Sequence, residues 1–489
     1  MTKALPVLKR ESEIGAWAFD ADVVIVGFGI AGACAALEAK AAGADVLVLE
    51  RASAGGGTSA LSSGIFYLGG GTPVQQACGV EDDADNMYRY MLTACGVSDP
   101  ALLRTFCDGN VAHFNWLESQ GVPFERSYFK GKHLCPPSKE GLVGTGNEKV
   151  WPNRDAARPA ARGHRVAREG DNAGSLAMEQ LLTRVAEAGT RILCDAHVQS
   201  LVRAEDGAIC GVSLRHGGAE QMVRARKGVI IAAGGFQMNR EMIGEYAPYL
   251  LPTAEAIGVP YNDGAGIRLG QSAGGAVEAM DAIHATACFY PPAQLIKGIV
   301  VNTQGQRFVS EDSYHGRTAA FIMEQPGRRA YLILDSEIFA YPDLGEFFGY
   351  KLIDGFDSID AMEQGLKLPA GSLSSTIAAY NKHAANGQDP LLHKHADWLK
   401  PLDKAPYAAF DISLDQAIYR YHSLGGLKTN AKAQVMGNDG APIKGLYAAG
   451  ACASGIVLTP KGYGSGMTLA AASFFGRVAG REAAAHTSE

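Results

Sequence analysis

DVVIVGFGIAGACAALEAKAAGADVLVLE, residues 22–50, is the stretch that decides the fold of this chain. It predicts a buried strand without polar alternation, then a helix of small and apolar residues, then a second buried strand, as in a parallel sheet. Between the first strand and the helix lie Gly27, Gly29 and Gly32, which spell GxGxxG. A strand, a turn of this kind and a helix in this order predict a site for a dinucleotide.

Each glycine has its own physical role in this pattern. Gly27 permits the tight turn, Gly29 lets the backbone approach a pyrophosphate, and Gly32 lets the helix pack closely on the strand. The pyrophosphate then lies at the positive end of the helix. Glu50 ends the second strand, 18 residues after Gly32, where its carboxylate can accept hydrogen bonds from a ribose diol. These features favour a dinucleotide site over a glycine-rich packing turn.

Three further segments favour FAD over NAD. GGGTSALSSGI (residues 55–65) is small, polar and flexible, whereas KGVIIAAGGF (227–236) and GLYAAGACASG (445–455) predict buried strands that end in glycines. A helix is expected over residues 465–485, and its positive N-terminal end near the cofactor would favour an anionic reduced flavin. Covalent attachment needs a histidine in residues 55–65, and that segment has none. The cofactor is therefore expected to be non-covalent FAD.

The residues expected to contact FAD come from these segments and from positions 197 and 198. They are Gly27, Gly29, Ile30, Ala31, Gly32, Glu50, Arg51, Gly57, Thr58, Ser59, Ser63, Gly64, His197, Val198, Ala233, Gly234, Gly235, Gly450, Ala451, Ser465, Met467, Thr468 and Leu469.

The predicted fold class is α/β, with more than one domain because 489 residues exceed a single core. A Rossmann-like FAD-binding domain is expected from both chain ends, residues 1–284 and 423–489. An inserted α+β cap, the catalytic domain, is expected over residues 285–422, where Tyr and Phe rise and runs of buried strand become sparse.

Composition excludes several other classes of protein. The net charge is −7 and no long basic run occurs, which argues against a nucleic-acid partner. Nine cysteines without a CxxC pair indicate a reduced compartment, and no signal peptide or membrane span is expected, so the predicted location is cytoplasmic. No metal-binding motif is present. Arginines at 154, 158, 162, 165 and 168 are expected to form a salt-bridged loop rather than a phosphate clamp.

Taken together, these segments resemble the fumarate reductase and succinate dehydrogenase flavoprotein family. The matching pieces are the GxGxxG with Glu50, residues 55–64, QRFVSED (306–312), HSLGGLKTN (422–430) and residues 445–455. They cover both ends of the chain and the edge of the cap. As a set they are specific, although none is specific alone.

Two positions depart from that family's pattern. Fumarate reductases hold a dicarboxylate with arginines, one of them eight residues after the arginine of RFxxE and also serving as the acid. The corresponding residue here is His315, with Tyr314 before it and Arg317 two residues beyond. The other arginine belongs to the family's NRLGGN, where this chain reads GYGSGMT and places Tyr463. The histidine of the family's HTMGG is matched by His422.

The exchange of arginine for tyrosine replaces dicarboxylate recognition by a neutral hydroxyl that can donate to a carbonyl. The arrangement is similar to 3-ketosteroid dehydrogenases, above all the 4-dehydrogenase branch. That resemblance implies catalytic roles for Tyr314, Tyr463 and Ser465. The residues expected to contact the substrate are Tyr419, Tyr421, His422 and Gly466, and one of the two tyrosines is expected to point inward because they lie on a strand.

The resemblance implies that a base removes a proton beside the 3-keto group while the next carbon gives a hydride to the flavin, at the 4,5 position. The partners expected are a steroid and an unidentified electron acceptor. Three alternatives stay open: a Δ1-type ketosteroid dehydrogenase, a fumarate- or enoate-type reductase with Arg317 as its acid, and a non-catalytic flavoprotein. The loop-rich, tyrosine-bearing cap counts against the last of these, because an electron carrier needs no enclosed pocket.

Overall fold

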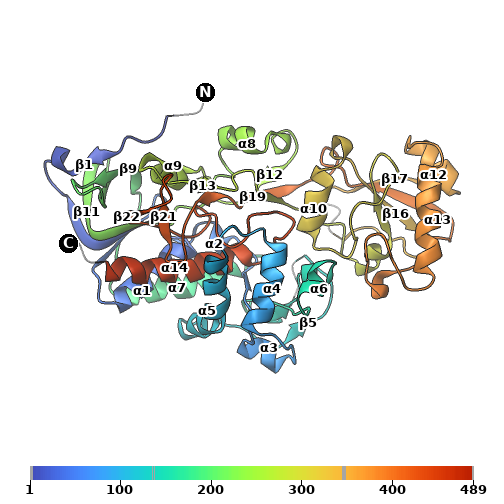
Figure 1. Ribbon diagram of the computed structural model, residues 1–489, viewed down its shortest axis with the longest axis horizontal. Helices are drawn as coiled ribbons and strands as arrows, with labels where there is room; N and C mark the ends of the chain where they lie inside the picture. The colour runs from blue at the N-terminus through green and yellow to red at the C-terminus, as the bar shows by residue number, and fades with distance from the viewer. Residues whose placement is uncertain (1–3, 135, 137, 344–347, 487–489) are drawn as a thin grey trace.

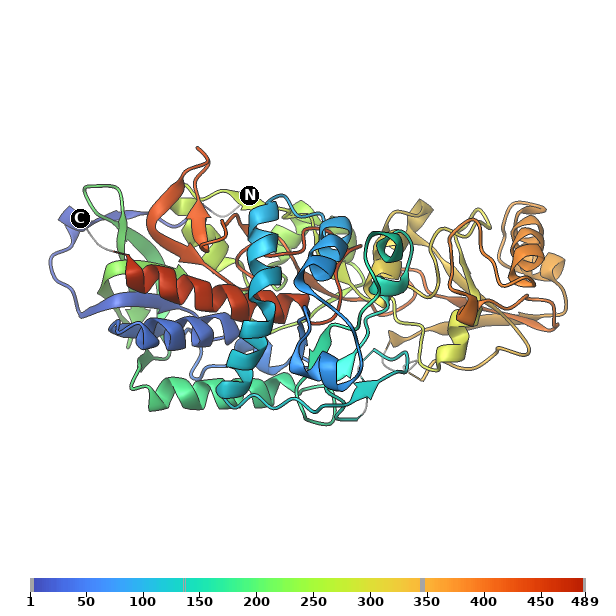
Figure 2. The same ribbon diagram turned by 60° about the horizontal axis from the view of Figure 1, so that its bottom comes forward.

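The computed structural model describes residues 4–134, 136, 138–343 and 348–486. Its described part forms an elongated molecule, with a nine-stranded sheet at one end and a four-stranded antiparallel sheet at the other (Figures 1 and 2). The helices pack on these sheets and fill the region between them.

Five parallel strands form the centre of the large sheet, in the order β8-β3-β2-β11-β22. They are β2 (Phe19–Val26), β3 (Val46–Leu49), β8 (Arg191–Leu193), β11 (Ala219–Ile231) and β22 (Pro442–Ala448). Strands from residues 19–231 and from residues 442–448 therefore share one sheet. The predicted α/β class and the FAD-binding fold from both chain ends are confirmed.

Four more strands extend this sheet. They are β1 (Lys9–Arg10), β9 (His197–Arg203), β10 (Ile209–His216) and β21 (Gln434–Met436). The strand β10 runs antiparallel to both β9 and the first half of β11, and β21 runs antiparallel to β22.

The central strands are buried on both faces, as their sequences predict. Val23 and Ile25 of β2 belong to the core on one side of the sheet, and Val24 and Val26 belong to the core on the other side. Because side chains alternate along a strand, an uninterrupted apolar run fills two cores at once.

Three helices lie together along the sheet: α1 (Ile30–Ala41), α7 (Gly174–Glu187) and α14 (Met467–Ala485). Figure 1 shows the red α14 beside the blue α1. Small residues allow this close approach, because a Cβ atom on Gly476 of α14 would overlap the carbonyl oxygen of Ala31. The C-terminal helix thus packs directly on the helix of the glycine motif.

A smaller unit built from residues 65–165 covers the other side of these helices. It contains α4 (Ala84–Ala94), α5 (Pro100–Ser119), β4 (Ile65–Tyr67), β5 (Tyr128–Phe129), β6 (Leu142–Val143) and β7 (Gly163–Arg165). The four strands pair in the order β4-β7-β6-β5.

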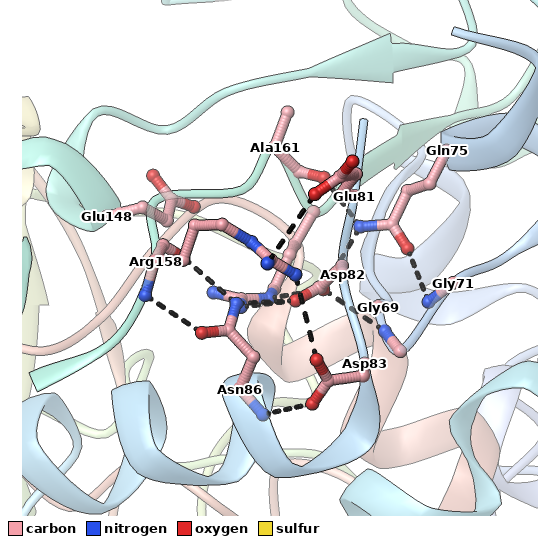
Figure 3. A network of polar contacts seen from close by, with 12 residues as sticks. Gly69, Gly71, Gln75, Glu81, Asp82, Asp83, Asn86, Glu148, Arg158 and Ala161 are labelled. Carbon is pink, nitrogen blue, oxygen red and sulfur yellow. Dashed lines mark hydrogen bonds and ion pairs between the residues drawn. The ribbon is translucent and has the colours of Figure 1, made fainter. Parts of the chain in front are cut away.

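A buried ion pair holds this smaller unit together. The guanidinium of Arg162 donates to both carboxylate oxygens of Asp82 at 2.8–2.9 Å, and both side chains are fully buried. Figure 3 shows Asp82 within the surrounding network, where Arg158 pairs with Glu81 and Asp83. Arg158 and Arg162 are therefore ion-paired, as the spacing of the arginines predicts.

The antiparallel sheet at the far end of the molecule has the order β15-β16-β18-β17. Its parts and the helices beside them are β15 (Ile299–Val301), β16 (Tyr331–Asp335), β17 (Lys351–Phe356), β18 (Tyr407–Asp411), α12 (Ile359–Gly365) and α13 (Ser372–Ala384).

Two strands connect the two ends of the molecule. β14 (Ile283–Ala285) and β19 (Arg420–Ser423) pair antiparallel, with His284 opposite His422. The predicted boundaries after residues 284 and 422 fall inside these strands. The division into domains at those positions stays a prediction.

The remaining described helices and strands are short. They are α2 (Gly57–Ala60), α3 (Pro73–Ala77), α6 (Asn153–Ala156), α8 (Arg240–Tyr246), α9 (Ala265–Ser272), α10 (His315–Met323), β12 (Glu255–Ala256), β13 (Val277–Glu278) and β20 (Gly426–Leu427), with short 3-10 turns between them.

Candidate active site

A cavity of about 490 Å³ lies where β2, β3 and β11 end and α1 and α14 begin. Ligands of open parallel sheets bind at this carboxyl edge, where helix N-termini direct N–H groups at the ligand. Glycines and the hydroxyls of Thr58, Ser59, Ser62 and Ser63 line one part, and Tyr463 and His422 line another.

The three glycines of the motif occupy three different environments. Gly27 has φ +105°, and a Cβ atom on it would overlap the carbonyl of Ala232 at the end of β11. A Cβ atom on Gly32 would overlap the carbonyl oxygen of Gly27. On Gly29, by contrast, it would meet only the Ser59 hydroxyl at 3.5 Å and otherwise face the cavity. Gly29 is therefore the glycine that leaves room for a ligand.

Glu50 and Arg51 follow β3 at the cavity. The Glu50 carboxylate accepts hydrogen bonds from the backbone N–H groups of Phe28 and Ala52, each at 2.7 Å. Each oxygen keeps a free lone pair, so the carboxylate is held in place and can still accept from a ribose hydroxyl. Arg51 pairs with Asp263 at 2.7 Å instead of facing a second charge inside the cavity.

Residues 257–263 form a strap along one side of the cavity. Ile257, Val259 and Asn262 of this strap line it. The strap is tied to residue 58, because the Thr58 hydroxyl oxygen accepts from the Val259 backbone at 3.1 Å and from the Asn262 amide at 2.7 Å. Sequence reasoning missed this strap, which follows no predicted strand and carries no glycine motif.

Most residues expected to contact FAD line the cavity. They are Gly27, Gly29, Ile30, Ala31, Glu50, Arg51, Gly57, Thr58, Ser59, Ser63, His197, Val198, Ala233, Gly234, Gly450, Ala451, Thr468 and Leu469. Five others lie outside the lining: Gly32, Gly64, Gly235, Ser465 and Met467. Gly32 serves packing, as its contact with Gly27 shows.

The donor set fits FAD. Backbone N–H groups at two helix N-termini suit a pyrophosphate, the free space at Gly29 lets it approach, and the fixed Glu50 carboxylate suits a ribose. Gly466, the N-cap residue of α14, also lines the cavity, so the positive end of that helix lies beside it. Among the described residues, no group of three or more His, Cys, Asp and Glu side chains is placed to hold a metal.

An aromatic cluster around Tyr463 borders the cavity. The ring of Tyr463 lies 4.2 Å from that of His284, 5.2 Å from that of His422 and 6.3 Å from that of Tyr314, measured between centroids. Burial raises the pKa of the Tyr463 hydroxyl, so it stays protonated at neutral pH and can donate. Tyr463 and His422 line the cavity itself.

The histidines of this cluster are uncharged at neutral pH. Burial lowers the pKa of His422 to about 4 and that of His315 to about 3, and it holds the pKa of His284 well below its usual value. The cluster therefore offers neutral donors and acceptors and no cation for a carboxylate.

Tyr314 and Ser465 come from distant parts of the sequence and contact each other in the folded chain. Their hydroxyl oxygens are 2.9 Å apart and share a hydrogen bond. Tyr314 precedes α10, whereas Ser465 precedes α14. The structure thus brings together the three residues predicted to be catalytic, Tyr314, Tyr463 and Ser465, although only Tyr463 lines the cavity.

The RFxxE motif fixes the segment that leads to Tyr314. The guanidinium of Arg307 donates to both oxygens of Glu311 at 2.8–2.9 Å and also pairs with Asp389. Glu311 accepts in addition from the Val300 backbone at 3.0 Å. This buried network anchors residues 307–311 to β15, three residues before Tyr314.

Tyr419 and Tyr421 are both buried, which corrects the expectation that one of them would point inward. Residues two apart on a strand lie on the same face, so the two side chains go together. Tyr419 donates to the Ile412 carbonyl at 2.5 Å, and Tyr421 to the Gln237 carbonyl at 3.4 Å. Neither lines the cavity, whereas the next residue, His422, does.

Arg317 does not line the cavity. Its guanidinium lies over the ring of Phe321 and donates to the Lys461 carbonyl at 3.3 Å. Arg51 is the one arginine among the residues that line the cavity, and it belongs to the nucleotide end.

Sequence reasoning missed His284 and Gln237. His284 contacts four rings of the cluster, and Gln237 lines the cavity and accepts from Ser423 at 3.1 Å. The strand β14 is only three residues long and gives no periodic signal. The antiparallel pairing of His284 with His422 is visible only in the folded chain.

This fold and this cavity define a flavoprotein that binds FAD through a Rossmann-like sheet. The chain belongs to the FAD binding domain family, which it matches over residues 22–466.

Individual relatives narrow the comparison. The chain is 32% identical to a 3-oxo-5-alpha-steroid 4-dehydrogenase of Comamonas testosteroni, over 89% of this chain and 93% of that one. It is 26% identical to a probable fumarate reductase of Shewanella frigidimarina, over 95% and 75%. Among solved structures, 3-ketosteroid-delta4-(5alpha)-dehydrogenase from Rhodococcus jostii RHA1, in complex with 4-androstene-3,17-dione, superimposes with a TM-score of 0.92 at 39% identity, covering 98% of this chain and 99% of that one. The predicted resemblance to both groups is confirmed.

Proposed function

We propose that this protein is an FAD-dependent dehydrogenase that introduces the 4,5 double bond into a saturated 3-ketosteroid. Two relatives that are named for this activity, at 32% and 39% identity, match nearly the whole chain. The observation that carries the proposal is the hydrogen-bonded pair of Tyr314 and Ser465 beside Tyr463, whose ring lines the cofactor cavity among buried, neutral histidines.

Neutral surroundings suit a ketone. A hydroxyl that stays protonated can donate to the ketone oxygen and stabilise the enolate-like charge that forms there. Tyr463 meets this need because burial raises its pKa. Tyr314 and Ser465 then form a route for the proton that leaves the carbon next to the carbonyl, since each hydroxyl both donates and accepts.

The reaction removes one proton and one hydride from the steroid, which becomes the conjugated enone. FAD, when bound, supplies the acceptor for that hydride. An external acceptor of unidentified nature then takes the two electrons.

The placement of Arg317 disfavours the fumarate- or enoate-type alternative. That reading needs Arg317 as an acid at the substrate, whereas its guanidinium contacts Phe321 and the Lys461 carbonyl. A Δ1-type dehydrogenase would use the same neutral residues. It would differ from the proposed enzyme only in the position of the steroid ring at which the double bond forms. We therefore keep it as an outcome of the test.

We further propose that FAD is held without a covalent bond and that the protein works in the cytoplasm. No histidine occurs in residues 55–65, and the eight described cysteines are all free, which supports a reducing compartment. No described helix has the length and apolarity needed to cross a membrane.

The test is anaerobic mixing of the holoenzyme with 5α- and 5β-saturated 3-ketosteroids, with fumarate and with urocanate. Bleaching of the flavin and formation of the 4-ene-3-one are expected with a saturated steroid. Formation of the 1-ene product alone would replace the proposal by the Δ1 reaction. Reoxidation of reduced enzyme by fumarate, without any steroid turnover, would replace it by the reductase. Acid precipitation of the holoenzyme is expected to release free FAD, and flavin that stays with the precipitated chain would contradict non-covalent binding.

A further inference from the structure

A turn outside both catalytic segments contacts both of them. Residues 145–148 follow β6 and run into the 3-10 turn Asn147–Lys149, and they come from the smaller unit, not from the segments that carry Tyr314 and Tyr463. The Thr145 side chain packs against Gly464, at 3.2–3.5 Å from where a Cβ atom on that glycine would lie. The turn therefore lies against the backbone between Tyr463 and Ser465.

Asn147 joins the two tyrosines through its side-chain amide. Its Nδ2 donates to the Tyr463 carbonyl oxygen at 2.9 Å, and its Oδ1 accepts from the Tyr314 backbone N–H at 3.4 Å. The side chain is completely buried. A primary amide is suited to this place because it carries a donor and an acceptor side by side.

Asn147 is itself held on both sides. Its backbone N–H donates to the Thr145 hydroxyl at 3.3 Å, and its carbonyl accepts from the Asn153 amide at 2.9 Å. Glu148 fixes the turn by accepting from the Thr145 hydroxyl at 2.9 Å and from the Tyr67 hydroxyl at 3.0 Å.

The turn is thereby anchored to the rigid core of the smaller unit. Figure 3 shows Glu148 beside the network around Asp82. Tyr67 lies in β4 and is paired with Gly163 of the neighbouring strand β7. Gly163 directly follows Arg162 in the sequence.

We propose that Asn147 is a positioning residue that sets the distance between Tyr314 and Tyr463, the two tyrosines that act on the steroid. The inference rests on the proposed function. Tyr314 and Tyr463 come from different segments, which are also joined by the Tyr314–Ser465 hydrogen bond and by the Arg317 guanidinium, which donates to the Lys461 carbonyl at 3.3 Å. Two groups that must act on one substrate need fixed spacing, because a shift of about 1 Å can cost about 10²-fold in rate.

The test compares Asn147→Ala and Asn147→Asp with the wild-type holoenzyme in the anaerobic reduction of the flavin by a saturated 3-ketosteroid. Asn147→Ala removes both contacts, whereas Asn147→Asp keeps the acceptor for Tyr314 and loses the donor to Tyr463. We expect the limiting reduction rate to fall by about 10–10² in both variants, with much smaller changes in steroid affinity and FAD content. A loss of affinity at an unchanged limiting rate would overturn the inference.

Asn110→Ala is the matched control. Asn110 is also completely buried and uses its amide on two backbone groups, Gly69 N–H and the Phe106 carbonyl, but contacts neither tyrosine. Its variant is expected to lose stability and keep the limiting rate per bound flavin. An equal rate loss in Asn110→Ala would mean that any buried asparagine has this effect, and would overturn the inference.

A double-variant cycle separates positioning from general loss of structure. If Asn147 acts by placing the Tyr314 hydroxyl, Asn147→Ala should cost much less in a Tyr314→Phe background than in the wild type. Equal costs in both backgrounds would contradict positioning through Tyr314.

A crystal structure of Asn147→Ala gives a readout that does not depend on turnover. The expected change is a separation of Tyr314 and Tyr463 different from 6.3 Å, with a lengthened Tyr314–Ser465 contact. An unchanged arrangement would overturn the inference about Asn147. A wild-type enzyme that reduces its flavin with none of the steroids would overturn the proposed function instead.

Discussion

At the scale of single residues, the tyrosine hydroxyls of this chain have distinct tasks that only their surroundings reveal. Tyr463 is 7% exposed and lines the cofactor cavity. Tyr447 is 2% exposed and donates to the Glu482 carbonyl at 3.4 Å, between β22 and the end of α14. Burial raises the pKa of both hydroxyls. The difference between them is therefore what each hydroxyl faces.

Tyr463→Phe should lower turnover of a saturated 3-ketosteroid by about 10²–10³, because the deleted hydroxyl acts mainly on the charge of the transition state. FAD content and melting temperature should stay close to wild type, since the ring still fills its space among His284, His422 and Tyr314. Steady-state assay, flavin absorbance and thermal unfolding measure the three quantities.

The control for this change is Tyr447→Phe, which also deletes one buried tyrosine hydroxyl. It is expected to keep turnover and to lose about 1 kcal/mol of stability, the usual value of a neutral hydrogen bond. Full turnover in Tyr463→Phe with bound flavin would remove Tyr463 from the mechanism.

The sequence alone predicts those site residues that belong to a recognisable motif. Tyr314 follows RFxxE and Ser465 lies in GYGSGMT, the segment that replaces the family's NRLGGN, and the fold places their hydroxyls 2.9 Å apart. His284 and Asn147 belong to no such motif. Their importance arises from contacts with residues more than 130 positions away, and single-sequence patterns do not record such contacts.

At the scale of elements, the β2–α1 turn was predictable because its glycines obey local sterics. The strand β11 was only partly predictable. Residues 228–231 form its buried end, whereas residues 223–226 alternate buried and exposed side chains and residues 219–224 pair with β10. The same strand thus carries two patterns, parallel and buried at one end, antiparallel and half-exposed at the other.

Gly29→Val should give a folded protein that lacks FAD. A side chain at Gly29 has free space in the protein itself and occupies the part of the cavity that a pyrophosphate would approach. Absorbance of the purified protein and its circular dichroism, compared with wild type stripped of flavin, provide the measurement.

Gly32→Val provides the comparison within the same turn. Its Cβ atom would overlap the Gly27 carbonyl, so this variant should lose the fold along with the flavin. Normal flavin content in Gly29→Val would show that this turn is not the binding turn.

At the scale of the whole molecule, the two chain ends form one cofactor site because α14 packs on α1 and β22 pairs with β11. Repeated strand-and-glycine patterns at both ends made this predictable. The turn at 145–148 and the strap at 257–263 were not predictable, since both are irregular segments whose positions depend on the assembled sheets.

The buried histidines predict how stability depends on pH. Burial lowers the pKa of His164 and His422 to about 4 and of His315 to about 3, and it holds the pKa of His113 and His284 well below the usual value. In the unfolded chain a histidine titrates near 6.5. Between these values the unfolded state binds more protons than the folded state, so stability must fall as the pH falls from about 6.5 toward 4.

Each such histidine should contribute a slope of about 1.4 kcal/mol per pH unit once the unfolded form is protonated. Urea unfolding of the holoenzyme in excess FAD, at pH 7.5, 6.5, 5.5 and 5.0, should give a free energy of unfolding that begins to fall between pH 7.5 and 6.5 and falls more steeply below pH 6.5. His284→Gln should make the falling region less steep by roughly one such slope. Paired carboxylates such as Asp82 titrate below this range. Burial alone would raise the pKa of Asp82, but the hydrogen bonds and charge of Arg162, with hydrogen bonds from Asn86 and Gly70, together lower it. Equal free energies of unfolding at pH 7.5 and 5.0 would contradict the assignment of these histidines as buried and neutral.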